Sequence, residues 1–447
     1  MVITGWFVLL VGAGALPIIA IAEPWVLPLW LVVCVLLAAV DVALAPSPRR
    51  LGVARSVPAR ARLGDTVHAT VTVSNPHRRT ARLAIRDAWR PSAGATPPRQ
   101  RLTVPAGERR SISTDLTPFR RGAISAAEVT IRSSGPLMLA ARQVSYAAPA
   151  TLTVLPRFSA RRHLPSRLAR LRELDGSASV QVRGQGTEFD SLREYVRGDD
   201  VRSIDWRASA RRTGALGRDA RHGGSTIVQP ELVVRTWRPE RDRRVVIVID
   251  SGRSAAARIG DETRIDTAFE TSLLLGALAS SAGDRVDLAI YDRRMRGRVR
   301  AANGAELLTK MVEVMATIEP ELIEPDWSAV PGIVRTSTSQ RALVVLCTTS
   351  ESPEAARALL AVLPELTRKH LVLVASVDDP SVIEATTRRA RSSDLAVAAA
   401  AERAMVERGR LAASVRALGA DIVTATPAEL PPVVADRYLG YKAAGRL

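Results

Sequence analysis

The densest run of chemically capable residues lies between Gly184 and Arg212, where acids and arginines alternate around three aromatic side chains. Carboxylates in such a run could do acid–base chemistry if the fold perturbed their pKa values. Nearly every acid here has an arginine close in the sequence, which favours ion pairs that keep the carboxylates ionised. We therefore expect a structural or partner-binding segment. The alternatives are a hydrolase that uses Glu188, Asp199 and Asp205, and a solvated loop of arbitrary charges.

The order of these residues resembles the signature of the domain of unknown function 58 family, roughly G-x-G-x-E-F-x-x-L-R-x-Y-x-x-G-D-x-x-R-x-I-D-W-x-x-S-A-R. The matching positions to which we assign a structural or partner-binding role are Gly184, Gly186, Glu188, Phe189, Arg193, Tyr195, Gly198, Asp199, Arg202, Asp205, Trp206, Ser209 and Arg211. Within this set we expect Trp206 to be packed at a domain contact and Asp205 to be paired with an arginine. Members of the family are commonly associated with AAA+ ATPases of the MoxR type, so the resemblance implies such a partner.

The composition limits the classes of function. The formal net charge of +18 comes almost entirely from arginine, since lysine occurs only at positions 310, 369 and 442. A basic surplus can indicate nucleic-acid binding, but no nucleic-acid motif accompanies it, and we expect no nucleic-acid partner. The two cysteines, Cys34 and Cys347, exclude a disulfide framework and are expected to be small core residues.

The first 46 residues predict a membrane anchor. Two apolar runs, 1–22 and 25–45, are each about the ~20 residues that span a bilayer, and Glu23-Pro24 separates them. We interpret them as a transmembrane helical hairpin with two spans. Five arginines follow the second run: Arg49, Arg50, Arg55, Arg60 and Arg62. By the positive-inside rule the soluble part is then cytoplasmic.

Three regions with different patterns follow the anchor. Residues 47–156 contain short runs that alternate with period two, such as 66–73, separated by Gly and Pro turns, which predicts a β-sandwich-like domain. Residues 157–240 contain a basic connector, with leucines at helical spacing, and the signature. Residues 241–447 alternate buried strands with helices, which predicts a doubly wound α/β domain. Its order of elements resembles the von Willebrand factor A fold.

That second resemblance implies a place for a metal ion, which binds hard oxygen ligands at the carboxyl ends of the strands. The family's first element is D-x-S-x-S, and here it reads Asp250-Ser251-Gly252-Arg253-Ser254. Asp250 and Ser254 match, but Gly252 lacks a hydroxyl. The two further expected elements are also altered, and Asp326 is the residue that could compensate if its loop folded over Asp250. We expect a degenerate remnant of the site and no metal cofactor, with Mg²⁺ as the alternative.

These observations favour a non-enzymatic, membrane-anchored, cytoplasmic adaptor that works with a MoxR-type ATPase on unknown protein targets. No catalytic constellation or phosphate-binding loop accompanies the signature. The competing interpretation is a cell-envelope assembly factor that binds peptide or polymer directly.

Overall fold

The computed structural model describes residues 2–21, 23–178, 188–196, 201, 204–211, 232–238, 243–302, 304–387 and 391–447. The chain divides into two compact units. The first consists of Met1–Ser159 with Asp261–Glu270 and Thr309–Leu322, and the second of Ala160–Gly260, Thr271–Leu308 and Ile323–Leu447. The expectation of a multidomain chain is confirmed.

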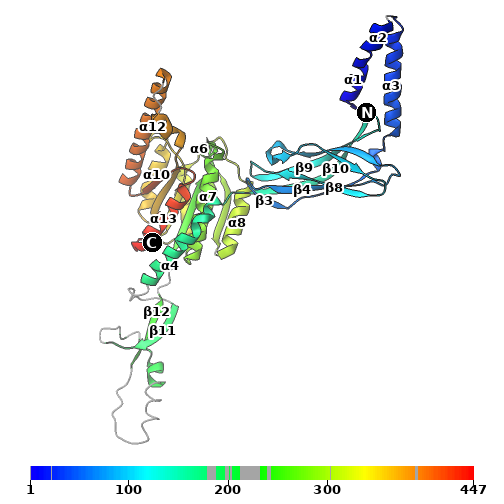
Figure 1. Cartoon of the computed structure of the whole chain (residues 1–447). Helices are drawn as coiled ribbons and strands as arrows, with labels where there is room; N and C mark the ends of the chain where they lie inside the picture. The colour runs from blue at the N-terminus through cyan, green and yellow to red at the C-terminus, as the bar shows by residue number, and fades with distance from the viewer. Residues whose placement is uncertain are drawn as a thin grey trace. The chain divides into compact units, whose positions relative to one another are not determined.

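Apolar helices open the first unit (Figure 1). Both α1 (Gly5–Ala13) and α2 (Ala15–Ile21) contact α3 (Val26–Leu44), and the Trp30 indole donates a hydrogen bond to the Leu10 carbonyl (3.1 Å). In the described chain one helical run, Val26–Arg50, is long and apolar enough to cross a membrane, whereas Gly5–Ile21 is shorter. A single possible span near the N-terminus is therefore present.

Two sheets follow, packed face to face as the period-two alternation predicts. The first has the order β1 (Val2–Ile3), β10 (Ala140–Leu155), β9 (Gly122–Ser134), β5 (Ala81–Trp89), β7 (Gln100–Val104), with β3 (Arg60–Arg62) parallel to β10. The second has the order β2 (Gly52–Ser56), β4 (Val67–Ser74), β8 (Arg109–Leu116), β6 (Ala95–Thr96). Val71 and Val73 of β4 meet Ile85 and Ile131 of the facing sheet in one buried cluster.

The second unit is built on a six-stranded sheet. Its order is β17 (Met295–Ala302), β16 (Arg285–Tyr291), β13 (Arg244–Asp250), β18 (Leu343–Cys347), β19 (Leu371–Val377), β20 (Asp421–Ala425). All neighbours are parallel except β16 and β17. The order reverses between β13 and β18, the first and fourth strands along the chain. Ligands of such sheets bind beyond the carboxyl ends of the strands at this point.

Helices cover both faces of this sheet, because its central strands are apolar on both sides. The helices are α6 (Arg253–Ala256), α7 (Arg264–Ser281), α8 (Gly304–Thr317), α9 (Val330–Ser337), α10 (Arg357–Thr367), α11 (Pro380–Thr387), α12 (Ser392–Ala417) and α13 (Leu430–Ala443). On one face, side chains of α9, α10 and α12 pack on Val344 and Leu346. On the other, Ser272 of α7 lies 3.9 Å from the Cys347 sulfur. Cys34 and Cys347 are buried, as predicted.

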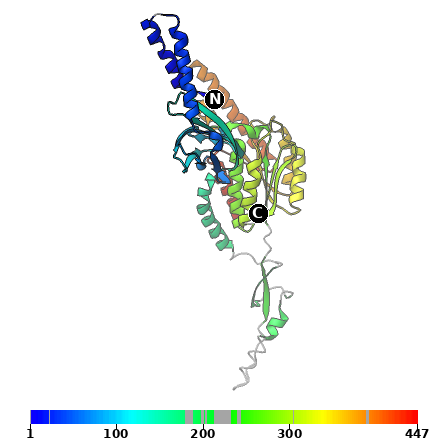
Figure 2. The ribbon, with the colours of Figure 1, turned by 90° about the vertical axis from the view of Figure 1, so that its right-hand side faces the viewer.

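The connector and signature form small elements of the second unit. Helix α4 (Leu164–Ala178) confirms the helical spacing of the leucines, and its Arg167 pairs with Asp436 of α13 (2.7 Å). Strands β11 (Glu188–Glu194) and β12 (Val233–Arg238) pair antiparallel, as the lower part of Figure 1 and the turned view of Figure 2 show.

Candidate functional site

The sheet edge at the reversal of strand order holds the Asp250 carboxylate, which is 3% exposed. Three donors surround it: the Gly252 N–H binds Oδ1 (2.7 Å), and the hydroxyls of Ser254 (2.7 Å) and Thr348 (2.8 Å) bind Oδ2. Burial raises the pKa of Asp250 above its ordinary value, and the three hydrogen bonds act against that shift. The structure therefore brings Asp250 and Ser254 together, as the sequence predicts, and adds Thr348 from the neighbouring strand.

The neighbouring carboxylate, Asp292, is held differently. Burial by itself would raise its pKa, but N–H groups of Arg294 and Arg293 and the Ser251 hydroxyl donate to it, and Arg296 lies beside it. The net pKa is below the ordinary value. Asp292 is thus an ionised, fully engaged anchor for its own loop. The two acids of this edge have pKa values displaced in opposite directions.

The donor set at Asp250 does not fit a divalent ion of the kind that the fold resemblance implies. Such a site needs several oxygen ligands around a carboxylate, and Gly252 supplies no hydroxyl. The structure gives the reason for this glycine. A Cβ at position 252 would lie 2.6 Å from the Ile323 carbonyl oxygen and 3.0 Å from Pro325 Cδ, so the loop packed there excludes a serine.

The remaining acids of this edge are committed to other contacts. Asp326 accepts hydrogen bonds from the N–H (3.0 Å) and hydroxyl (2.6 Å) of Ser328, and so caps the short helix η6 (Trp327–Ala329). Glu324 pairs with Arg253 at 2.8 Å, on the surface. Arg253 therefore binds Glu324, and the Asp326 carboxylate does not supply the missing charge.

One described part of the signature is a helical segment, 206–211, attached to β12. Oδ1 of Asp205 accepts the N–H groups of Arg207 and Ala208 (3.0 Å each), which makes Asp205 the N-cap of this segment. The hydroxyl of Ser209, 4% exposed, donates to the Asp205 carbonyl (2.8 Å) and accepts from the Val233 N–H (2.9 Å). Asp205 and Ser209 thus have structural roles, and the pairing of Asp205 with an arginine stays a prediction.

The expectation that Trp206 is packed is wrong: its side chain is 64% exposed. Hydrogen bonds of Asp205 and Ser209 hold this turn together and to β12, and none of these bonds involves the indole. Other matched positions fall as follows: Glu188, Phe189 and Arg193 lie in β11, Tyr195 donates its N–H to the Leu232 carbonyl (2.8 Å), and Arg211 is exposed. Gly184, Gly186, Gly198, Asp199 and Arg202 lie outside the described residues.

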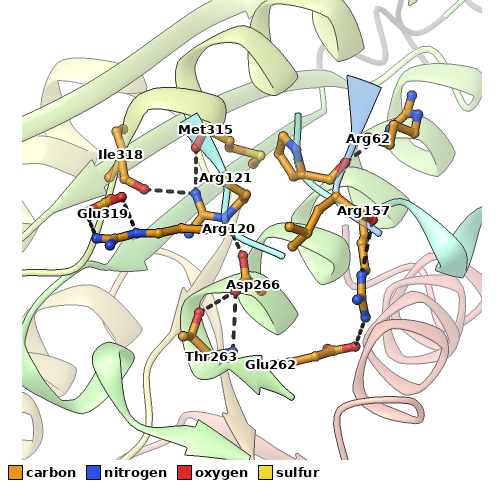
Figure 3. Close-up of polar contacts among 12 residues, drawn as sticks. Arg62, Arg120, Arg121, Arg157, Glu262, Thr263, Asp266, Met315, Ile318 and Glu319 are labelled. Carbon is orange, nitrogen blue, oxygen red and sulfur yellow. Dashed lines mark hydrogen bonds and ion pairs between the residues drawn. The ribbon is translucent and has the colours of Figure 1, made fainter. Parts of the chain in front are cut away.

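Sequence reasoning missed an arginine site in the first unit (Figure 3). Arg121, whose side chain is 6% exposed, donates to the carbonyls of Met315 and Ile318 (2.9 Å each) at the end of α8. It also pairs with Asp266 in the first turn of α7 and stacks 4.6 Å from the centroid of the Phe269 ring. A cation at a helix C-terminus and an acid at a helix N-terminus both complement the helix dipole.

Two further ion pairs flank Arg121, the first exposed and the second half-buried. Arg120 binds Glu319 through two nitrogens (3.0 and 2.6 Å), and Arg157 binds Glu262 at 3.0 Å (Figure 3). The run of two arginines before a glycine at 120–122 was the only signal in the sequence, and nothing in it distinguished the buried arginine from the exposed one.

Part of the chain is similar to a known protein family and to proteins of two mycobacteria. Residues 191–385 match the family model described as "Protein of unknown function DUF58". "Uncharacterized protein Rv1480" of Mycobacterium tuberculosis (strain ATCC 25618 / H37Rv) and "Uncharacterized protein Mb1516" of Mycobacterium bovis (strain ATCC BAA-935 / AF2122/97) are each 26% identical over 217 residues. The match covers 47% of this chain and 61% of each relative, so it spans about three fifths of their length.

Solved structures offer only slight likenesses. The CARDB domain of the PF1109 protein from Pyrococcus furiosus, solved in complex with di-metal ions, has a TM-score of 0.19 and 13% identity over 23% of this chain and 91% of that one. A protein of unknown function from Porphyromonas gingivalis W83 has a TM-score of 0.18 and 16% identity over 24% of this chain and 47% of that one. Neither bears on function. The family match agrees with the resemblance of the signature: residues 191–385 are similar to the DUF58 family.

Proposed function

We propose that the chain is a membrane-anchored, cytoplasmic, non-enzymatic adaptor that works with a MoxR-type AAA+ ATPase in the assembly or maturation of other proteins. The observation that carries this proposal is the exposure of Trp206 at the centre of the signature. Tryptophan is among the residues that most often anchor protein interfaces, because a rigid ring covers a large apolar area.

Other apolar side chains of the same segment are also exposed. Leu192 is 44%, Val196 60% and Val201 62% exposed. Leu192 lies in β11, and the other two residues follow that strand in the sequence. Exposed apolar side chains that form one patch are typical of interaction sites. The charged side chains around them would select the partner more than they would strengthen binding.

The anchor and the sheet fit the same proposal. We propose that α1 and α2 together form a second span beside α3, and that Arg49 and Arg50 mark the cytoplasmic end. We also propose that the second unit is a von Willebrand factor A-like domain that has lost its metal site. The strand order with an antiparallel edge strand and the Asp250–Ser254 pair support this.

Two other functions compete. A cell-envelope assembly factor would use the same exposed surface to bind peptide or polymer directly. A hydrolase has less support, because the Asp205 carboxylate that it would use is engaged by two backbone N–H groups.

The test is affinity purification of the full chain from native membranes, with mass-spectrometric identification of partners. We expect a MoxR-type ATPase with the unsubstituted chain and at least a tenfold loss with Trp206→Ala. Phe119→Ala is the matched control, because Phe119 is also an aromatic residue that is 64% exposed. Absence of an ATPase from the unsubstituted sample would refute that partner, and equal recovery with Trp206→Ala would refute the surface.

A further inference from the structure

The turn between β9 and β10 is bound to both ends of the apolar helical region. This turn, Gly135–Met138, carries exposed Leu137 (49%) and Met138 (41%) at its tip, and Met138 adopts a left-handed backbone (φ 57°). A bulky apolar residue in that conformation, exposed to solvent, has no explanation in the packing of the sandwich.

Asp41 holds the turn from the side of α3. Its carboxylate is completely buried and accepts three backbone N–H groups, from Leu137 (2.8 Å), Leu139 (2.8 Å) and Ala140 (3.2 Å). A Cβ at Gly135 would lie 2.1 Å from the Asp41 carbonyl oxygen, so glycine allows the close approach. Asp41, the acid that interrupts the apolar run, therefore binds α3 to the β9–β10 turn.

Thr4 holds the turn from the side of α1. The Thr4 hydroxyl donates to the carbonyls of Met138 (2.5 Å) and Leu139 (2.9 Å), and its N–H donates to Leu139 (3.1 Å). Phe7 of α1 and Ala38 of α3 pack with Leu139 in one apolar cluster. The turn is thus fixed at the N-terminus of α1 and near the C-terminus of α3.

These contacts set the depth of the turn if α3 crosses a bilayer. Asp41 lies three residues before Leu44, the last residue of α3, which is about 5 Å along a helix axis. Nineteen helical residues extend about 28 Å, close to the thickness of the hydrocarbon core. The groups bonded to Asp41 then lie at the boundary between headgroups and acyl chains.

We infer that Leu137 and Met138 are a third membrane contact, which enters the lipid interface beside the two helix ends and holds the β-sandwich against the bilayer. The inference rests on the membrane anchoring in the proposed function. The occupant is lipid because the turn is bound at Asp41, and the exposed side chains of α3 on either side of Asp41 are also apolar: Val40 is 51% and Leu44 40% exposed.

The test places an environment-sensitive fluorophore (NBD) on single introduced cysteines and uses phosphatidylcholine vesicles that contain shallow spin-labelled lipid. Labels go on Met138→Cys and, because position 138 has an unusual backbone, also on Leu137→Cys. The matched control is Phe119→Cys, because Phe119 is also apolar and exposed. Phe119 lies just before the start of β9, and the turn lies just after its end. The thirteen residues of β9 separate the sites by about 40 Å. Leu36→Cys lies near the middle of α3 and, in parallel vesicles that contain deep spin-labelled lipid, reports whether the chain is in the membrane at all.

The reconstituted full chain carries two native cysteines, and both are buried. Burial raises the pKa of the Cys347 thiol to about 12, which makes it a poor nucleophile for the label. The unsubstituted chain therefore serves as the control for background labelling. We expect quenching at positions 137 and 138 at least twofold greater than at 119. Quenching at 36 with no difference between the tip and position 119 overturns this inference and leaves the anchor intact. No quenching at 36 overturns the anchor itself, and the inference with it.

Discussion

The arginine site of the first unit and the signature of the second place their side chains opposite to what residue type predicts. The Arg121 side chain is only 6% exposed, although arginine is usually a surface residue. Trp206 is 64% exposed, although a tryptophan within a dense motif is expected in a core. The difference is in the partners. Arg121 satisfies its donors with two carbonyls, a carboxylate and a ring, whereas Asp205 and Ser209 hold their segment without the indole.

This contrast separates stability from recognition. Loss of a buried charge leaves its partner unpaired in a medium of low polarity, which is costly. Loss of an exposed ring costs the fold little. Substitution of Arg121 should therefore lower stability, and substitution of Trp206 should lower partner binding without lowering stability.

The largest effect is expected for Arg121→Met, which leaves the Asp266 carboxylate, 16% exposed, without its cation. We expect the free energy of unfolding of the detergent-solubilised full chain to fall by about 3–5 kcal/mol. The matched control is Arg120→Met, since Arg120 is the preceding arginine and its ion pair with Glu319 is exposed. That variant should lose less than about 1 kcal/mol in chemical denaturation. Equal losses would show that burial of Arg121 is not what matters.

Asp41→Ala extends the comparison to the anchor. Three backbone N–H groups, in two buried hydrogen bonds and one part-buried one, would lose a charged acceptor, and we expect a loss of about 1.5–3 kcal/mol. Asp115, whose side chain is 54% exposed and bonds His68, provides the control. An Asp115→Ala variant should stay within about 0.5 kcal/mol of the unsubstituted chain. A similar result for Asp41→Ala would mean that α3 is not fastened to the sandwich as described.

Gly252→Ser tests the sheet edge of the second unit by restoring the hydroxyl of the metal motif. The added Cβ meets the Ile323 carbonyl at 2.6 Å, so we expect a loss of about 1–3 kcal/mol from overpacking. Calorimetric titration of the unsubstituted chain with Mg²⁺ and Mn²⁺ should show no saturable submillimolar binding. Such binding, if Asp250→Ala abolished it, would contradict the prediction of a degenerate site.

A smaller, pH-dependent effect is expected at His370, which is 8% exposed. Burial first, and then Lys369, lower the pKa of this imidazole below its ordinary value of 6.5. Below pH 6.5 the unfolded chain therefore binds a proton that the folded chain refuses, and stability is lost as the pH falls further. Denaturation midpoints of His370→Leu should lose this acid dependence. The same change at exposed His68 should leave it in place.

The smallest effect on stability is expected for Trp206→Ala. Because the ring is exposed, the free energy of unfolding should change by about 0.5 kcal/mol or less. The same variant is expected to lose its partner, so stability and binding must be measured on one preparation. A destabilisation of several kcal/mol would return Trp206 to a packing role and would remove the distinction from Arg121.

The periodicities of the sequence were enough to predict the elements. Alternation with period two predicted the sandwich strands, and the continuous apolar run at 245–249 predicted the strand that carries Asp250 at its end. These predictions succeed because burial acts on residues two apart in a strand or three to four apart in a helix. The signature also identified the family region, since a long ordered motif does not depend on packing.

Tertiary structure alone decided which conspicuous residues are buried. Arg120 and Arg121 are identical neighbours, and only the ends of α7 and α8, more than 140 positions later in the chain, make one a core residue. In the sequence, Gly252 stands where the metal motif has a hydroxyl ligand. In the structure, a side chain at this position would clash with the Ile323 carbonyl, so glycine is required. In the sequence, Asp41 is a charged residue that interrupts an apolar run. In the structure, the β9–β10 turn, about a hundred residues away, supplies three N–H donors to its carboxylate. Such contacts are set by shape and by the pairing of polar groups across the fold, which local patterns do not encode.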